Sequence, residues 1–158
     1  MDKERALEVG CGDGMLTRDY ILPLKFKAID MFDKCPIGIG KVNEFKPEFS
    51  TIDSVSIEKM EDFVWQRDYS AIYMRWCVGY LDDNNLKLFL MNAKRHLITE
   101  PKARTRSSHP KSYIFILDNV LEEFELKGVE PVKGERQRAS STLDKIFKDA
   151  GLKIMKKS

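Results

Sequence analysis

The chain has 158 residues, of which 42% are hydrophobic and 33% are charged, a composition typical of one globular domain. Its formal net charge of +2 is too small to favour a nucleic-acid partner. It contains neither an apolar run long enough to cross a membrane nor a signal peptide at its N-terminus. We therefore expect a single domain over residues 1–158, in an intracellular protein, cytoplasmic or nuclear, with no membrane partner.

The first informative stretch is an apolar run, Ala6–Val9, that leads directly into glycines at positions 10, 12 and 14. Residues without a Cβ let the backbone turn sharply and lie close to a flat ligand. The stretch therefore predicts a strand, a ligand-binding loop and a helix that begins near Met15. Dinucleotide sites place their third glycine one residue later. An ordinary glycine-rich turn between a strand and a helix is the alternative that the motif leaves open.

Short apolar runs and helical patterns alternate along the rest of the chain. This alternation favours parallel strands joined by right-handed crossovers. It predicts a doubly wound α/β fold with a mostly parallel sheet, whose ligand lies beyond the carboxyl ends of the strands. The further expected strands are Ala28–Met31, Val55–Ile57, Ala71–Met74, Tyr113–Leu117 and Leu152–Met155, and the expected helices are Leu16–Leu24 (interrupted by Pro23), Ile37–Asn43, Asn84–His96 and Ser141–Ala150.

A carboxylate closes the second expected strand. In nucleotide-binding α/β folds an acid at this place accepts hydrogen bonds from ribose hydroxyls, and a charged acceptor forms stronger hydrogen bonds than a neutral one. Asp33 is the first choice for this role and Asp30 the second. A solvated acid in a loop is the alternative.

The remaining polar features indicate no metal site. Cys11, Cys35 and Cys77 are odd in number and widely spaced, which predicts buried free thiols and not a disulfide framework or a zinc site. His96 and His109 are isolated in the sequence. The segment Thr99–Lys111, with two prolines and four Lys or Arg residues, predicts a mobile solvated loop, with an anionic docking site as the alternative.

Several stretches, in the same order along the chain, resemble the protein N-terminal methyltransferases, which methylate the α-amino group of an exposed X-Pro-Lys type N-terminus. The glycine loop, preceded by Glu8, also resembles motif I of the S-adenosylmethionine-dependent methyltransferases. The resemblance implies the Rossmann-like class I fold, S-adenosylmethionine as cofactor, S-adenosylhomocysteine as product and a protein N-terminus as substrate. The stretches that carry it are Ile21–Leu24, Ile29–Asp33, Asp68–Asp83, Leu117–Asn119 and Ile146–Leu152.

The resemblance also implies roles for residues on the cofactor side. Gly10 matches the first glycine that contacts the cofactor, within the loop that Gly12 and Gly14 continue. Asp33 matches the acid on the ribose, and Met60 and Glu61 occupy the places beside the adenine. These residues are the expected cofactor-binding set, together with Arg75, which stands where the family has a glutamine that touches the cofactor.

On the acceptor side, Trp76 corresponds to the tryptophan that walls the substrate channel. Asp118 and Asn119 correspond to the Asp-Asn pair after the fifth strand, whose asparagine holds the substrate N-terminus, and Tyr80 stands where the family has a histidine near the reacting amine. The implied catalytic residues are therefore Asp118, Asn119 and Tyr80, and the implied substrate-binding residues are Trp76 and Asn119. Orienting a neutral amine for in-line attack is the task that such groups would share.

Three departures from the family pattern bear on activity. Met15 stands where the family has an arginine that pairs with the cofactor carboxylate, and we expect Arg75 to supply the missing positive charge. Tyr80 is a poorer base than histidine at neutral pH. The segment Val129–Arg138 is basic where the family has a substrate-binding acid, and would repel an ammonium group. A catalytically inactive methyltransferase-like subunit with an assembly or scaffold role is therefore the alternative function, and a small-molecule methyltransferase is a third.

The ends of the chain also differ from the family pattern, in which helices precede the first strand and a seventh, antiparallel strand lies between strands five and six. Here the first strand follows five residues, and the sixth expected strand ends the sequence. We therefore expect either a piece of a longer gene product or a shortened subunit whose fifth-strand edge a partner subunit completes, because exposed strand edges pair readily with other chains.

Overall fold

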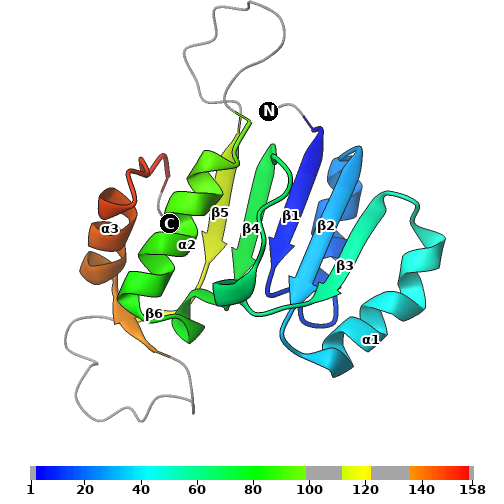
Figure 1. The fold of residues 1–158 in the computed structure, drawn as a ribbon, viewed down its shortest axis with the longest axis horizontal. Helices are drawn as coiled ribbons and strands as arrows, with labels where there is room; N and C mark the ends of the chain where they lie inside the picture. Colours follow the sequence, from blue (N-terminus) through cyan, green and yellow to red (C-terminus); the bar gives the residue numbers. More distant parts are fainter. Residues whose placement is uncertain (1–2, 99–111, 122–135, 157–158) are drawn as a thin grey trace, which may run out of the picture.

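A five-stranded parallel sheet forms the centre of the molecule (Figure 1). The computed structural model describes residues 3–98, 112–121 and 136–156. The strand order is β3-β2-β1-β4-β5, and all four neighbouring pairs are parallel. The predicted doubly wound, mostly parallel α/β fold is confirmed. The strands are β1 (Arg5–Val9), β2 (Ala28–Asp33), β3 (Ile52–Ile57), β4 (Ala71–Arg75) and β5 (Tyr113–Leu117).

Helices cover both faces of this sheet, because the strands carry apolar side chains on both faces and each face must be buried. On one face, α2 (Asp83–Arg95) and α3 (Ser140–Asp149) share a core with residues such as Leu7 and Ile72. On the other face, α1 (Pro36–Phe45) and the helical segment after the glycine loop pack on Ile29 and its neighbours. The two cores hold the carboxyl ends of β1, β2 and β4 in fixed positions.

Local signals explain where the helices begin and end. The Asp82 carboxylate accepts a hydrogen bond from the Asn85 backbone N–H at 2.8 Å and so caps α2. The helical segment that begins at Met15 continues as a π-helix, η1 (Thr17–Ile21), and then as a 3₁₀-helix, η2 (Leu22–Leu24). Pro23 lacks an N–H and interrupts regular helix formation there, as the sequence predicted.

Aromatic side chains extend the core on the face of the sheet that carries α2. After β3 the chain forms a short 3₁₀-helix, η4 (Met60–Asp62), and then an aromatic stretch. Phe63 stacks on Phe32 of β2 with ring centroids 4.2 Å apart, and Trp65 contacts both Phe63 and Tyr69. Offset and edge-to-face ring contacts of this kind add to the stabilisation by burial. They anchor η4 beside the carboxyl end of β2.

The C-terminal part corrects one prediction. The expected strand Leu152–Met155 does not form in the part of the chain that the structure describes. Instead β6 (Val120–Leu121) and β7 (Arg138–Ala139) make a separate two-stranded parallel sheet. β5 is therefore the outer strand of the main sheet among the described residues, and the partner at its edge stays a prediction. The expected loop Thr99–Lys111 and most of the basic segment Val129–Arg138 lie outside the described residues.

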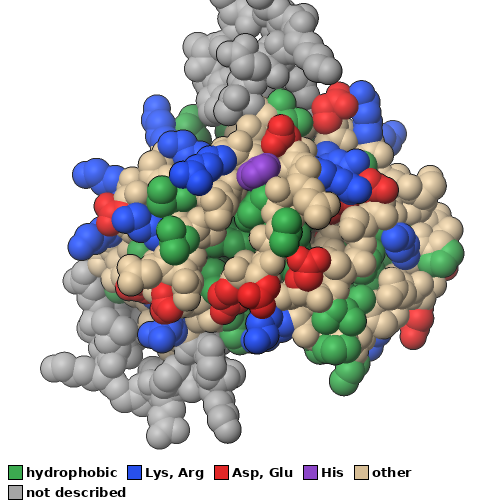
Figure 2. All heavy atoms as spheres, viewed as in Figure 1, with side chains coloured by type: hydrophobic (Ala, Val, Ile, Leu, Met, Phe, Trp, Pro, Cys, Tyr) green, Lys and Arg blue, Asp and Glu red, His purple; other side chains and the backbone are tan. Residues whose placement is uncertain are grey.

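The face that carries α2 and α3 shows charged side chains of both signs interspersed with hydrophobic ones (Figure 2). Within the described ranges, no helix is both long and apolar enough to cross a membrane. Because charges of both signs are mixed in Figure 2, the surface in this view offers no large positively charged area to attract a polyanion.

Candidate active site

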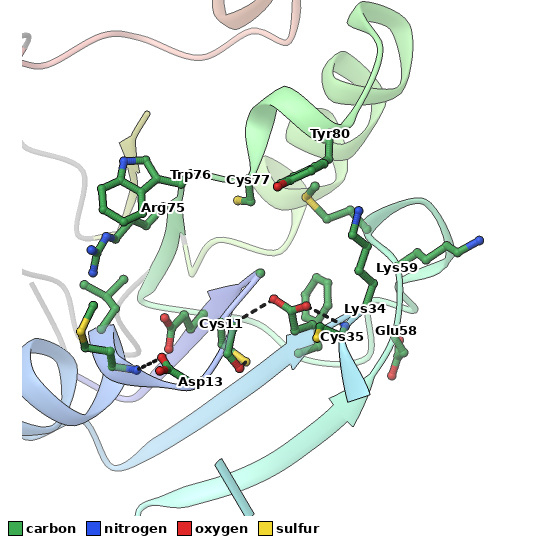
Figure 3. Close-up of a pocket in the computed structure, with 18 of the residues that line it drawn as sticks. Cys11, Asp13, Lys34, Cys35, Glu58, Lys59, Arg75, Trp76, Cys77 and Tyr80 are labelled. Atoms are coloured by element: carbon green, nitrogen blue, oxygen red, sulfur yellow. Dashed lines mark hydrogen bonds between the residues drawn. The ribbon is translucent and has the colours of Figure 1, made fainter. Parts of the chain in front are cut away.

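A cavity of about 590 Å³ opens at the carboxyl ends of β1 to β4 (Figure 3). In an open parallel sheet the crevice for a ligand lies where the strand order reverses, here between β1 and β4. The segments that follow these four strands supply most of the lining. The lining residues that carry the argument below are Glu8, Gly10, Gly12, Asp33, Met60, Glu61, Arg75, Trp76, Cys77 and Tyr80.

The glycine loop makes the floor of this cavity. Gly10 has φ +65°, and a Cβ at this position would lie 2.8 Å from the Cys77 Cβ. Gly12 has φ +54° and also lines the cavity. Both features require glycine, since L side chains avoid this region of φ. The loop therefore presents bare backbone to the cavity, and its contact with a cofactor stays a prediction.

Gly14 has a different task from the one the sequence assigned to it. It does not line the cavity, and a Cβ there would lie 2.7 Å from the Phe45 ring of α1. Its φ of +77° turns the chain into the helical segment. Gly38 was not predicted from the sequence; a Cβ there would lie 2.5 Å from the Gly12 carbonyl oxygen. Glycines 14 and 38 thus let α1 approach the loop closely.

Asp33 joins the loop to the end of β2. Its Oδ2 accepts a hydrogen bond from the Gly12 N–H at 2.8 Å, and its Oδ1 accepts one from the Cys35 N–H at 2.8 Å. Each carboxylate oxygen has a second lone pair, so Asp33 can still accept from a ligand hydroxyl. Asp30, the second choice for the ribose role, is wrong for it: it is buried away from the cavity and paired with Arg5 and Arg67 at 2.8 and 2.9 Å.

The cavity lining includes a carboxyl group, Glu8, and a guanidinium, Arg75, and no hydrogen bond is found between them. Burial raises the pKa of Glu8 to about 7, against the opposing effects of the hydrogen bond that Thr17 donates and of the charge of Arg75. The Arg75 Nε is buried, and no described residue accepts a hydrogen bond from it. A guanidinium with free donors is a natural partner for a carboxylate.

Aromatic residues form the wall opposite the glycine loop (Figure 3). The Trp76 ring lies over the Arg75 guanidinium at 4.0 Å, and Trp76 has φ +51°, a strained conformation for a non-glycine residue that costs about 1–3 kcal/mol and clusters at functional sites. Tyr80 belongs to a short 3₁₀-turn, η5 (Val78–Tyr80), and its ring lies 4.0 Å from the Lys34 ammonium. Met60 and Glu61 line the cavity from η4.

The structure does not bring Asp118 and Asn119 into the cavity lining. Asp118 Oδ2 accepts a hydrogen bond from the Val78 N–H at 3.0 Å, and its Oδ1 accepts one from the Asn119 N–H at 2.9 Å. Asn119 is exposed. Asp118 therefore binds the backbone of the turn that carries Tyr80, and the catalytic roles of this pair stay predictions.

All three cysteines line the same cavity. Cys11 and Cys77 are buried, as predicted, and burial raises the pKa of both thiols, which keeps them neutral. The prediction is wrong for Cys35, which is exposed because it precedes α1 at the cavity rim. Among the described residues, no group of three or more His, Cys, Asp or Glu side chains is placed to hold a metal ion.

The profile of a family described as AdoMet dependent proline di-methyltransferase matches residues 1–158. The chain is 24% identical over 96% of its length to alpha N-terminal protein methyltransferase 1 of Dictyostelium discoideum, and 28% identical over 95% to N-terminal Xaa-Pro-Lys N-methyltransferase 1-A of Xenopus laevis. It spans 52% and 62% of the length of these relatives.

Solved methyltransferases share the fold. A SAM-dependent methyltransferase of Leishmania major superimposes with a TM-score of 0.74 at 18% identity, covering 98% of this chain and 56% of that one. A second S-adenosylmethionine-dependent methyltransferase, from Clostridium acetobutylicum, superimposes with a TM-score of 0.74 at 15% identity, covering 98% of this chain and 75% of that one. At these identities the likeness concerns the Rossmann-like fold, and it agrees with the sheet order observed here.

Proposed function

Because the chain belongs to the family of AdoMet-dependent proline di-methyltransferases, we propose that it transfers a methyl group from S-adenosylmethionine to the α-amino group of a protein N-terminus. The observation that carries the proposal is the open cavity at the switch point of the sheet, with a glycine loop and Asp33 on one side and Trp76 and Tyr80 on the other. The two relatives named above, N-terminal methyltransferases, support the substrate class.

The residues present fit the family cofactor. A volume of about 590 Å³ lies in the range of roughly 300–1,000 Å³ of small-molecule sites. The bare backbone at Gly10 and Gly12 would lie against the adenosyl part, with Asp33 accepting from its ribose hydroxyls. The Arg75 guanidinium, whose Nε has no hydrogen-bond partner among the described residues, would take its carboxylate. When bound, S-adenosylmethionine supplies an electrophilic methyl group on a sulfonium sulfur.

The acceptor side would orient the amine. In methyl transfer, the lone pair of a neutral amine forms the new N–C bond while the electrons of the C–S bond go to sulfur, and the methylated ammonium that results then loses a proton to water. Trp76 and Tyr80 would exclude bulk water and fix the direction of attack, and the Tyr80 hydroxyl would hydrogen-bond to the amine. Asn119, near this wall in sequence, is proposed to hold the substrate N-terminus.

The test is mass spectrometry of a peptide that begins with Xaa-Pro-Lys after incubation with the chain and S-adenosylmethionine. The same peptide with an acetylated N-terminus is the control. Methylation of the free peptide only is the expected result. Methylation of both peptides at lysine would contradict the substrate class, and cofactor binding without methylation of either would contradict the activity.

A methyltransferase-like subunit without catalysis is the second candidate. One observation favours it: the Lys34 ammonium lies 4.0 Å from the Tyr80 ring, which places positive charge where an N-terminal ammonium would approach. The histidine that the family has at the Tyr80 position is also missing. In this case the cavity would bind the cofactor without catalysis, or would bind no ligand. The edge of the sheet at β5 would then pair with a partner subunit.

A further inference from the structure

The turn η5 (Val78–Tyr80) carries the acceptor-side tyrosine but is too short to be stable by itself. Isolated 3₁₀-turns have poor hydrogen-bond geometry and form only where other segments hold them. Val78 and Gly79 are buried, while Tyr80 is 40% exposed and lines the cavity. The position of the Tyr80 ring therefore depends on whatever fixes this turn.

Arg138 of β7 binds the turn from the side away from the cavity. Its guanidinium is buried, and Nη1 donates to the Val78 carbonyl at 3.0 Å while Nη2 donates to the Leu81 carbonyl. Nε donates to Asp83 Oδ1 at 2.8 Å, at the first turn of α2. One side chain thus connects the residues on both sides of Tyr80 to the start of a helix.

Two further hydrogen bonds hold the turn in place. The Val78 N–H donates to Asp118 Oδ2 at 3.0 Å, and the Arg136 N–H donates to the Gly79 carbonyl at 2.7 Å. These partners come from segments at least 40 positions away in the sequence. The basic segment was expected to repel an ammonium, but the Arg138 charge is buried and paired with Asp83, so it does not face the cavity.

We propose that Arg138 is a positioning residue for the acceptor side, which acts on the reaction only through the turn that presents Tyr80. This rests on the proposed function. Removing the guanidinium takes one donor away from each of the buried carbonyls of Val78 and Leu81, which is costly, so the turn relaxes. The cofactor side is not touched, because Gly12 and Asp33 share no hydrogen bond with residues 136–156 of the described chain. Asp118, which accepts a hydrogen bond from the Val78 N–H, would then be a second positioning residue for the same turn.

The experiment compares Arg138→Met and Arg138→Lys with the wild type. Arg136→Met is the matched control, because Arg136 binds the turn through its backbone N–H only. The first measurement is S-adenosylhomocysteine affinity by calorimetry, and the second is kcat and KM for the Xaa-Pro-Lys peptide. The third is amide hydrogen exchange over residues 76–81.

We expect Arg138→Met to keep cofactor affinity within about twofold, to lower kcat roughly tenfold or more, and to speed exchange at the Tyr80 amide. The kcat and exchange rate of Arg138→Lys should lie between those of Arg138→Met and the wild type, because an ammonium cannot reach three acceptors in a plane. Unchanged kcat and exchange in a folded Arg138→Met would overturn the inference, and so would an equal loss of cofactor affinity and kcat.

Failure of the proposed function has a different signature. If the wild type binds the cofactor but methylates no peptide, the exchange data still decide: faster exchange confined to residues 76–81 supports positioning, and unchanged exchange refutes it. If Arg138→Met does not fold, Asp83→Asn, which weakens the Nε contact of the same guanidinium, takes its place with the same readouts and the same criteria.

Discussion

The two sides of the cavity are built in different ways. On the cofactor side, the contact that shapes the glycine loop joins Gly12 to Asp33, 21 positions apart, across two adjacent strands. On the acceptor side, the turn that carries Tyr80 depends on Asp118 and Arg138, 40 and 60 positions from Val78. The contact that shapes the glycine loop therefore joins neighbouring strands, whereas the turn on the acceptor side depends on segments that are distant in the sequence.

This difference separates the two proposed roles of the site, which are cofactor binding and turnover of the acceptor. Changes on the cofactor side should alter ligand affinity directly, because backbone and carboxylate atoms there face the cavity. Changes in the supports of the acceptor side should alter turnover and leave cofactor affinity intact. Substitutions on each side of the cavity test this separation.

Gly10→Ala should abolish cofactor binding, with a loss in affinity of roughly a hundredfold or more. The new Cβ would lie 2.8 Å from the Cys77 Cβ, at a φ of +65° that alanine avoids. Calorimetry with S-adenosylhomocysteine measures the effect. Gly40→Ala in α1 is the control, since nothing lies within 4 Å of its Cβ, and it should bind normally with slightly higher stability. Normal binding by Gly10→Ala would refute the assigned loop contact.

Asp33→Asn should weaken cofactor binding by roughly ten- to a hundredfold. The amide has one acceptor oxygen, whereas the carboxylate serves two backbone N–H groups at 2.8 Å and has lone pairs left for a ligand. Asp19→Asn, on the exposed face of η1, is the control and should not change affinity. The comparison fails if both variants bind S-adenosylhomocysteine as tightly as the wild type.

Arg75→Gln should discriminate between two ligands. S-adenosylhomocysteine carries a carboxylate, and 5′-methylthioadenosine lacks the whole amino-acid part. We expect the variant to lose roughly tenfold in affinity for the first ligand and nothing for the second, because the buried Nε has no partner among the described residues. Lys34→Gln, a cation on the same cavity rim, should lose nothing for either. Equal losses for both ligands would show that Arg75 acts on the fold instead.

Stability should depend on pH through Glu8 of β1, which lines the cavity. Its folded pKa of about 7 exceeds its ordinary value of 4.5, so the folded state holds a proton that the unfolded state has lost between these values. The unfolding free energy therefore falls as pH rises through this window and levels off above it. Between pH 6 and pH 7 the unfolding free energy of the wild type should fall by about 1 kcal/mol more than that of Glu8→Gln, as measured by urea unfolding. Parallel pH profiles would contradict the assignment.

The cofactor side could be predicted from sequence because its signals are local. Three glycines after an apolar run, and an acid at the end of the next strand, specify a loop and its anchor through backbone sterics and short-range hydrogen bonds. Gly14 and Asp30 show the limit: whether a residue faces the cavity, the α1 helix or a buried ion pair depends on packing that no spacing encodes.

The acceptor side could not be predicted in the same way. The sequence identifies Trp76 and Tyr80 by resemblance only, and it gives a basic segment around Arg138 whose burial against the turn follows from tertiary packing. Leu152–Met155 has the apolar pattern of a strand but does not form one, since strand formation requires a neighbour to pair with. Exposure of Cys35 likewise depends on where α1 begins.

We infer that the crevice between β1 and β4 binds the adenosyl cofactor of the family. The most direct test is calorimetric titration of the wild-type chain with S-adenosylhomocysteine. We predict saturable binding of one ligand per chain, with a Kd of roughly 1–100 µM. Absence of saturable binding up to millimolar ligand would contradict the claim.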